Sequence, residues 1–175
     1  MMRSLFMTLM LTSILSAQVF LTKDEALKIY FPSPSAVERK TLFLTDAQVE
    51  KIQTQARANV DSKIVTYYVG RHENHLQGYA LFDTRTIRTE PATYMVVISP
   101  DSSVRAVELL AFYEPEDYLP PTRWLAQFQQ KKVLDEVWLK RGVQNIAGAT
   151  LSAQALTEGV RRILATFRIA IPKEH

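Results

Sequence analysis

A turn of small residues before the last predicted helix has the residue types that bind a phosphate. Gly148 and Ala149 leave room for an anion beside the backbone, and Thr150 follows at the start of a long amphipathic segment. The first turn of a helix has unpaired N–H groups at the positive end of the helix dipole, and both favour a phosphate there. The Thr150 hydroxyl could itself be esterified to that phosphate. Leu151 and Ser152 complete the turn, and the Ser152 hydroxyl could donate to the phosphate or only cap the helix.

Two histidines form a second group that could do chemistry. His72 and His75 are three residues apart, and two histidines at that spacing on a helix can share a metal ion. The residues between them, Glu73 and Asn74, are polar and follow a predicted strand, which is typical of a solvated hairpin turn. The other histidine, His175, ends the sequence and has no recognisable ligand spacing to this pair. A turn is therefore the better interpretation, and no metal is expected.

No other pattern assigns a catalytic role. The nucleophile-elbow sequence Gly-x-Ser-x-Gly is absent, and nothing assigns a base to any serine. Four acidic residues around the end of a predicted strand have the spacing of a surface loop: Glu108, Glu114, Glu116 and Asp117. The chain has no cysteine, which excludes disulfides, cysteine-ligated metals and a lipoprotein anchor.

The composition is that of a globular protein with one main domain. The chain has 175 residues, of which 47% are hydrophobic and 22% are charged, so it can bury a sizeable core. The net charge of +3 is small, and the basic residues are dispersed rather than arranged in a stripe with aromatic residues. A nucleic-acid partner is therefore not expected.

The N-terminal segment 1–17 has the layout of a secretory signal peptide. Arg3 precedes an uncharged apolar run over 5–15, and two small residues follow this run. The run is shorter than the roughly 20 apolar residues that a membrane-spanning helix needs. An uncleaved membrane anchor remains the alternative, because the apolar run could extend through Leu21. We expect the mature chain to begin near Gln18 and to lie in the periplasm or elsewhere outside the cytoplasm.

Two helices are predicted in the segment 18–60, which we interpret as an N-terminal helical extension. The first covers 22–30, with Thr22 as its N-cap and Glu25 three residues later, and it ends at a proline-rich sequence. The second begins after Thr45. Its apolar face is thin, so we expect it to pack at an edge of the fold.

The segment 61–175 changes to a strand pattern and is expected to be the functional domain. Four runs rich in β-branched and aromatic residues predict strands over 64–69, 78–82, 94–99 and 104–112. Their short connections favour an antiparallel meander. A helix is predicted over 123–130, and the last helix begins near Thr150 with apolar residues on one face. The predicted fold class is α+β, an antiparallel sheet packed by helices.

The order of these parts resembles the FMN-binding domain family. This family includes the periplasmic flavin-carrying subunits of sodium-pumping quinone reductases and related electron-transport complexes. The segments that carry the resemblance are Tyr94–Ser99 with the turn after it, Val107–Pro115, Arg123–Phe128 and Ile146–Ser152. The resemblance covers about Ile64 to Phe167, which is most of the mature chain.

The resemblance implies an FMN that is covalently attached at Thr150. In that family a separate flavin transferase esterifies the threonine of a Ser/Thr-Gly-Ala-Thr motif to the FMN phosphate. By position this threonine is Thr150, so the N-terminus of the last helix would hold the flavin phosphate. The flavin ring needs an apolar, partly aromatic surface, which Tyr118 or Trp124 could provide, with Glu114 in the neighbouring loop. Phe112 is better explained as a core residue.

The sequence departs from the family pattern at several positions. Ala147 stands where a small hydroxyl residue is usual, and Gln144 stands where an acidic residue is usual. The acidic position is one that the transferase would recognise, so both departures bear on covalent attachment. The loop with Glu114, Pro115 and Tyr118 lacks two glycines of the family motif, which implies a differently shaped loop near the flavin.

These observations predict an exported, membrane-associated FMN-binding flavoprotein that transfers electrons and is more an electron carrier than an enzyme on its own. The expected partners are a flavin transferase during maturation and a membrane-bound redox protein. Two alternatives stay open from the sequence. One is a periplasmic binding or interaction module of the same fold without covalent flavin, and the other is an extracytoplasmic flavin reductase.

Overall fold

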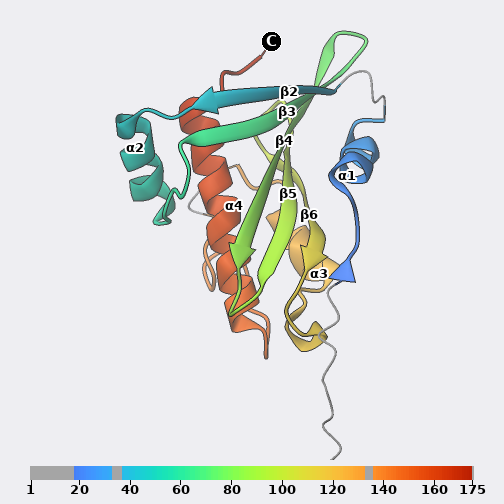
Figure 1. The fold of residues 1–175 in the computed structure, drawn as a ribbon, viewed down its shortest axis with the longest axis vertical. Helices are drawn as coiled ribbons and strands as arrows, with labels where there is room; N and C mark the ends of the chain where they lie inside the picture. The colour runs from blue at the N-terminus through green and yellow to red at the C-terminus, as the bar shows by residue number, and fades with distance from the viewer. Residues whose placement is uncertain (1–17, 33–36, 133–135, 175) are drawn as a thin grey trace, which may run out of the picture.

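An antiparallel sheet is the centre of the computed structural model, which describes residues 18–32, 37–132 and 136–174. Its strands are β1 (Gln18–Val19), β2 (Val37–Phe43), β3 (Ile64–His72), β4 (His75–Thr86), β5 (Pro91–Ile98) and β6 (Val104–Phe112). The six strands lie in the order β1-β6-β5-β4-β3-β2, and every pairing is antiparallel (Figure 1). Together with the helices described below, this confirms the predicted α+β fold.

The hairpin between β3 and β4 is tighter than the sequence indicates. The strands continue up to a two-residue turn at Glu73 and Asn74, whose φ angles are 48° and 66°. Two-residue hairpin turns with positive φ at both positions match the twist of the flanking strands. His72 and His75 are the last paired residues before this turn, and the His75 Nδ1 lies 2.9 Å from the Glu73 carbonyl oxygen.

The sequence analysis predicts only helices in segment 18–60, and this is wrong for β1 and β2. β2 pairs with β3 along its whole length, and β1 pairs with the end of β6. β2 is an edge strand with three consecutive charged residues, Glu38 to Lys40, so it lacks the alternation of a half-buried strand. The division of the chain at residue 61 stays a prediction, and the sheet extends across it.

Helix α4 (Thr150–Ala170) covers one face of the sheet. The apolar residues predicted on one side of this helix are all buried: Ala153, Leu156, Val160, Ile163, Leu164 and Phe167. Helix α2 (Asp46–Ala56) packs beside α4 and buries Ile52 and Ala56 completely. The opposite face of the sheet is covered in part by helix α1 (Lys23–Tyr30), which begins and ends as predicted (Figure 1).

Short helical elements join β6 to the start of α4. They are the 3₁₀ turn η2 (Glu116–Tyr118), helix α3 (Thr122–Leu125) and the 3₁₀ turn η3 (Ala126–Phe128). The helix predicted over 123–130 is therefore shorter than expected and tightens into a 3₁₀ turn at its end. Among the residues that the structure describes, no helix is both long and apolar enough to cross a membrane.

Candidate functional site

The start of α4 is an uncapped helix N-terminus. Ala149 is the N-cap residue, and no side chain in the described part of the chain caps the helix there. The first intrahelical bond runs from the Ala153 N–H to the Ala149 carbonyl, at 3.1 Å. The N–H groups of the preceding three residues, Thr150 to Ser152, therefore have no partner within the helix. These donors and the helix dipole together favour an anion at this position.

Gly148 leaves the approach to these donors open. Its φ is +83°, a left-handed conformation that glycine adopts without strain, and a Cβ built on it would meet no atom within 4 Å. The Ala149 N–H donates to the Ile146 carbonyl at 3.1 Å, which closes the turn before the helix. Of the two small residues predicted to admit a phosphate, Gly148 thus has open space beside it, whereas Ala149 is buried.

Thr150 is exposed at the first position of α4. Its hydroxyl oxygen accepts a hydrogen bond from the Asn145 side-chain amide at 3.0 Å. Leu151, the next residue, is 48% exposed, which is unusual for a leucine in a helix with so large a buried face. The residue best placed to form a phosphoester is therefore accessible to a second protein.

Ser152 has neither of the two side-chain roles that the sequence suggests. Only 1% of its surface is exposed, and its hydroxyl donates to the Tyr118 carbonyl at 2.6 Å instead of capping α4. This hydrogen bond connects η2 to the first turn of the helix. The backbone N–H of Ser152 has no partner within the helix, while its side chain fixes Tyr118 beside the helix start.

Glu114 stabilises the turn between β4 and β5. Its carboxylate Oε1 accepts three backbone N–H groups, from Arg88, Thr89 and Glu90, at 2.8, 2.7 and 2.9 Å. Burial alone would raise the pKa of this carboxyl, but the three donors and the nearby Arg88 charge outweigh it and lower the pKa. Glu114 is thus an ionised, buried side chain that faces inward, and it holds this turn at the same end of the molecule as the start of α4 (Figure 1).

Tyr118 has an arginine over its ring. The guanidinium carbon of Arg88 lies 4.7 Å from the centre of the Tyr118 ring, a cation–π contact. Arg88 is exposed, Tyr118 is half-buried, and Ser152 holds the Tyr118 backbone. The pair places an aromatic ring and a positive charge next to the helix start.

Trp124 is a buried positioning residue and offers little surface to a ligand. It is 4% exposed and packs edge-on against Phe128, with the ring centres 5.3 Å apart. Its indole N–H donates to the Gln144 carbonyl at 2.6 Å, and the Gln144 N–H donates to the Gln127 side chain at 2.9 Å. The backbone of Gln144 is therefore held on both sides, and this fixes the loop that leads to Thr150.

The sequence analysis missed three residues of this site: Arg88, Gln127 and Asn145. Arg88 and Gln127 come from segments far from α4 in the sequence, and no local pattern indicates that they approach it. Asn145 lies beside the small-residue turn, and its short side-chain amide next to such a turn is a usable signal.

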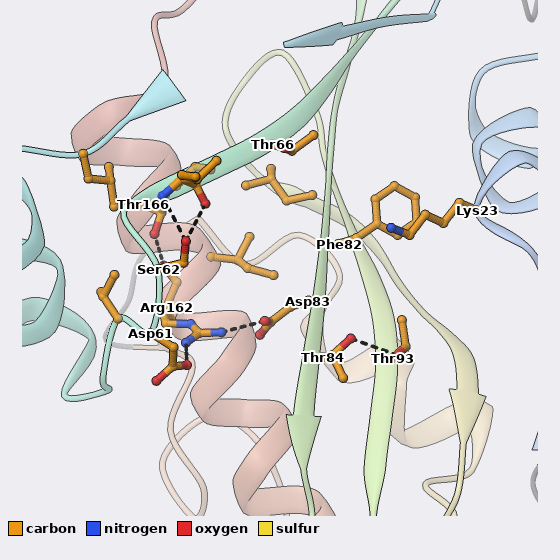
Figure 2. A pocket seen from close by; sticks show the side chains of 16 residues that line it. Lys23, Asp61, Ser62, Thr66, Phe82, Asp83, Thr84, Thr93, Arg162 and Thr166 are labelled. Atoms are coloured by element: carbon orange, nitrogen blue, oxygen red, sulfur yellow. Dashed lines mark hydrogen bonds and ion pairs between the residues drawn. The ribbon is translucent and has the colours of Figure 1, made fainter. Parts of the chain in front are cut away.

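A cavity of about 400 Å³ lies elsewhere in the described residues. It opens where β3 diverges from β4, and Figure 2 shows Arg162 on its floor between Asp61 and Asp83. The Arg162 guanidinium lies 2.6 Å from each carboxylate, and the Arg85 guanidinium lies 3.3 Å from Asp61, so the carboxylates are paired with arginines of the same protein. Arg162 is twelve residues after Thr150, about 18 Å along the helix. The cavity is therefore separate from the candidate site.

Within residues 18–32, 37–132 and 136–174, no group of three or more His, Asp or Glu side chains is placed to hold a metal ion. His175 lies outside the described residues. His72 and His75 face each other across the hairpin and remain a pair with no third ligand in this part of the chain.

Comparisons with known proteins support the fold. No protein-family model matches the sequence, and no curated protein matches it. The crystal structure of Shewanella oneidensis NqrC matches the structure with a TM-score of 0.52, over 86% of this chain and 84% of that chain. This chain has the fold of NqrC. The sequence identity to NqrC is 15%, so the likeness confirms the resemblance predicted from the sequence at the level of the fold alone.

Proposed function

We propose that this protein is an extracytoplasmic flavoprotein that carries FMN at the start of α4, through a phosphoester to Thr150. The observation that carries the proposal is the combination of an uncapped helix N-terminus, an open glycine and an exposed threonine hydroxyl within three residues. The chain shares the fold of NqrC, and its sequence resembles the FMN-binding domain family. That likeness supports the cofactor class.

The residues present fit the phosphate end of FMN. A phosphodiester keeps one negative charge, which the N–H groups of Thr150 to Ser152 would hydrogen-bond and the helix dipole would stabilise by ~0.3–1 kcal/mol. Gly148 leaves space for the phosphate oxygens, since a Cβ there meets nothing within 4 Å. A covalent bond would also keep the cofactor on an exported protein, which would otherwise lose it to a dilute medium.

The residues around the helix start would orient the ring. Tyr118 supplies an aromatic face, and Arg88 supplies a positive charge that favours an anionic reduced ring. Trp124 and Gln127 would not contact the ring themselves. They hydrogen-bond the backbone of Gln144 and so hold the loop that positions Thr150. When bound, FMN would supply reversible uptake of one or two electrons.

The proposed partners follow from this role. A flavin transferase would attach the cofactor, and a membrane-bound redox protein would exchange electrons with it. β1, the first described element, pairs with the end of β6 and lies at the same end of the molecule as the start of α4 (Figure 1).

The proposal is tested by coexpression of the full chain with a flavin transferase, followed by denaturation, proteolysis and mass spectrometry. We expect an FMN adduct on the peptide that contains Thr150. The folded protein should also show flavin absorption that bleaches with dithionite and returns in air. Protein that stays colourless and unmodified, while a known substrate of the same transferase is modified in the same cells, would contradict the proposal.

A further inference from the structure

A single side-chain amide contacts the hydroxyl that the proposed function uses. The Asn145 Nδ2 group donates to the Thr150 Oγ1 at 3.0 Å, across the turn that precedes α4. Both residues are exposed, so burial does not force the contact. The amide is neutral and therefore adds no charge next to an incoming phosphate.

Asn145 is itself held in place. Its neighbour Gln144 has its carbonyl bound by the Trp124 indole and its N–H bound by the Gln127 side chain. On the C-terminal side of Asn145, the Ala149 N–H donates to the Ile146 carbonyl and closes the turn. The backbone of the loop is thus fixed on both sides of Asn145, and the amide is aimed at Thr150 without the help of a ligand.

The contact leaves the hydroxyl ready to react. A threonine hydroxyl has one proton and two lone pairs, and the Asn145 amide occupies one lone pair. The proton and the second lone pair remain available to an approaching molecule. Threonine has restricted χ1 rotation because it is β-branched, and the hydrogen bond restricts it further.

We infer that Asn145 is a positioning residue for modification of Thr150, an inference that rests on the proposed function. In the reaction, the Thr150 Oγ1 forms a bond to the FMN phosphorus of a flavin dinucleotide. The phosphoanhydride bond to that phosphorus breaks, the nucleoside monophosphate leaves, and the threonine proton passes to a base of the transferase. Asn145 gives and takes no proton or electron, and it orients the attacking oxygen.

The test measures the rate of covalent flavin incorporation into purified full-length protein by a flavin transferase with flavin dinucleotide. Asn145→Leu keeps the size of the side chain but removes the donor, and we expect its kcat to fall about tenfold, as for one lost hydrogen bond. The KM for the protein should stay unchanged. The matched control is Gln154→Leu, which removes an exposed amide one turn into α4 and should leave both constants unchanged.

The same measurement in the Thr150→Ser protein distinguishes an effect on the orientation of the hydroxyl from a general loss of loop structure. In Thr150→Ser the hydroxyl lacks the β-methyl group that restricts its rotation. Removal of the Asn145 amide should therefore slow incorporation by a larger factor in the Thr150→Ser protein than in the wild type. A loop that had simply lost its structure would give the same factor in both backgrounds.

Three results would overturn the inference. They are wild-type kinetics for Asn145→Leu, an effect on KM alone, and equal factors in the two backgrounds. Thermal unfolding of each variant should match the wild type, because Asn145 is exposed; if the leucine variant does not fold, Asn145→Ala makes the same test. If the wild-type protein takes up no flavin, the proposed function fails and this inference fails with it, whereas normal wild-type labelling with unaffected Asn145→Leu contradicts the inference alone.

Discussion

The polar groups around the middle of α4 pair with one another, whereas no described side chain caps the first turn of α4. In the middle, Arg162 pairs with Asp83, which also accepts the Tyr94 hydroxyl at 2.5 Å. A Cβ built on Gly159 would lie 1.7 Å from the Tyr94 hydroxyl oxygen. At the start, the helix has no side-chain cap, and a Cβ built on Gly148 would meet nothing within 4 Å.

This comparison of the two regions distinguishes residues that stabilise the fold from residues that an outside molecule can reach. Buried polar groups in the middle of α4 satisfy one another, so changes there should cost stability and leave the flavin on each folded molecule unchanged. Within the part of the chain that the structure describes, the first turn of α4 has no side-chain cap, so on the proposed function changes there should affect flavin attachment and cost little stability.

The largest loss of stability is expected from Asp83→Ala. This change leaves the Tyr94 hydroxyl without its acceptor and removes a carboxylate from Arg162, and both groups are buried or nearly so. Breaking a buried ion pair costs about 3–5 kcal/mol, and we expect the lower end because Arg162 keeps Asp61. Chemical denaturation measures the loss. A variant as stable as the wild type would show that the ion pair does not support the fold.

A smaller loss is expected from Gly159→Ala. Its Cβ would press on the ring of Tyr94, which is fully buried and cannot move aside. Overpacking costs about 1–3 kcal/mol and outweighs the gain of roughly 1 kcal/mol that alanine brings to a helix. We expect a net loss of up to about 2 kcal/mol by denaturation, with normal flavin content in the folded fraction. A more stable variant would mean that the helix and sheet can separate at this point.

Glu114→Gln tests a residue that is near the start of α4 but faces inward. Loss of the charge that binds three backbone N–H groups should cost about 1–2 kcal/mol at pH 7, with flavin attachment unchanged. The folded-state pKa of Glu114 is lowered, so its contribution is complete above the unfolded pKa of about 4.3 and is lost as the pH falls through the lower folded value.

The stability difference between wild type and Glu114→Gln should therefore be constant from pH 8 to pH 6 and shrink as the pH falls below about 4. Comparing the two proteins at each pH cancels the contributions of other carboxyl groups. A difference that grows on acidification would show that the pKa is raised instead of lowered.

The smallest effect on stability is expected from Gly148→Ala. A left-handed φ of +83° costs an alanine about 1 kcal/mol, and no steric clash adds to this. The rate of flavin incorporation should fall more clearly than the stability, because the methyl group lies in the path of the phosphate. A Gly148→Ala protein that loses several kcal/mol of unfolding free energy but takes up flavin at the normal rate would contradict this account. It would assign to Gly148 the structural role that we assign to Gly159.

The sequence predicts the sheet better than it predicts the site. Four strands and α4 follow from alternation and helical periodicity, which are local patterns. β2 was missed because three charged residues give an edge strand no apolar face, and Glu38 to Lys40 is such a run. The turn at Gly148 and the start of α4 at Thr150 agree with the prediction. The inward hydroxyl of Ser152 and the contacts of Glu114 and Trp124 depend on distant segments, so no local pattern could reveal them.

The most direct test of the central claim compares wild type, Thr150→Ser and Thr150→Ala, each coexpressed with a flavin transferase and run on a denaturing gel under ultraviolet light. The account predicts fluorescent bands for wild type and Thr150→Ser and a dark band for Thr150→Ala, with equal thermal stability for the three proteins. A Thr150→Ala band as fluorescent as the wild type would contradict attachment at Thr150. Dark bands for all three would contradict covalent attachment to this protein.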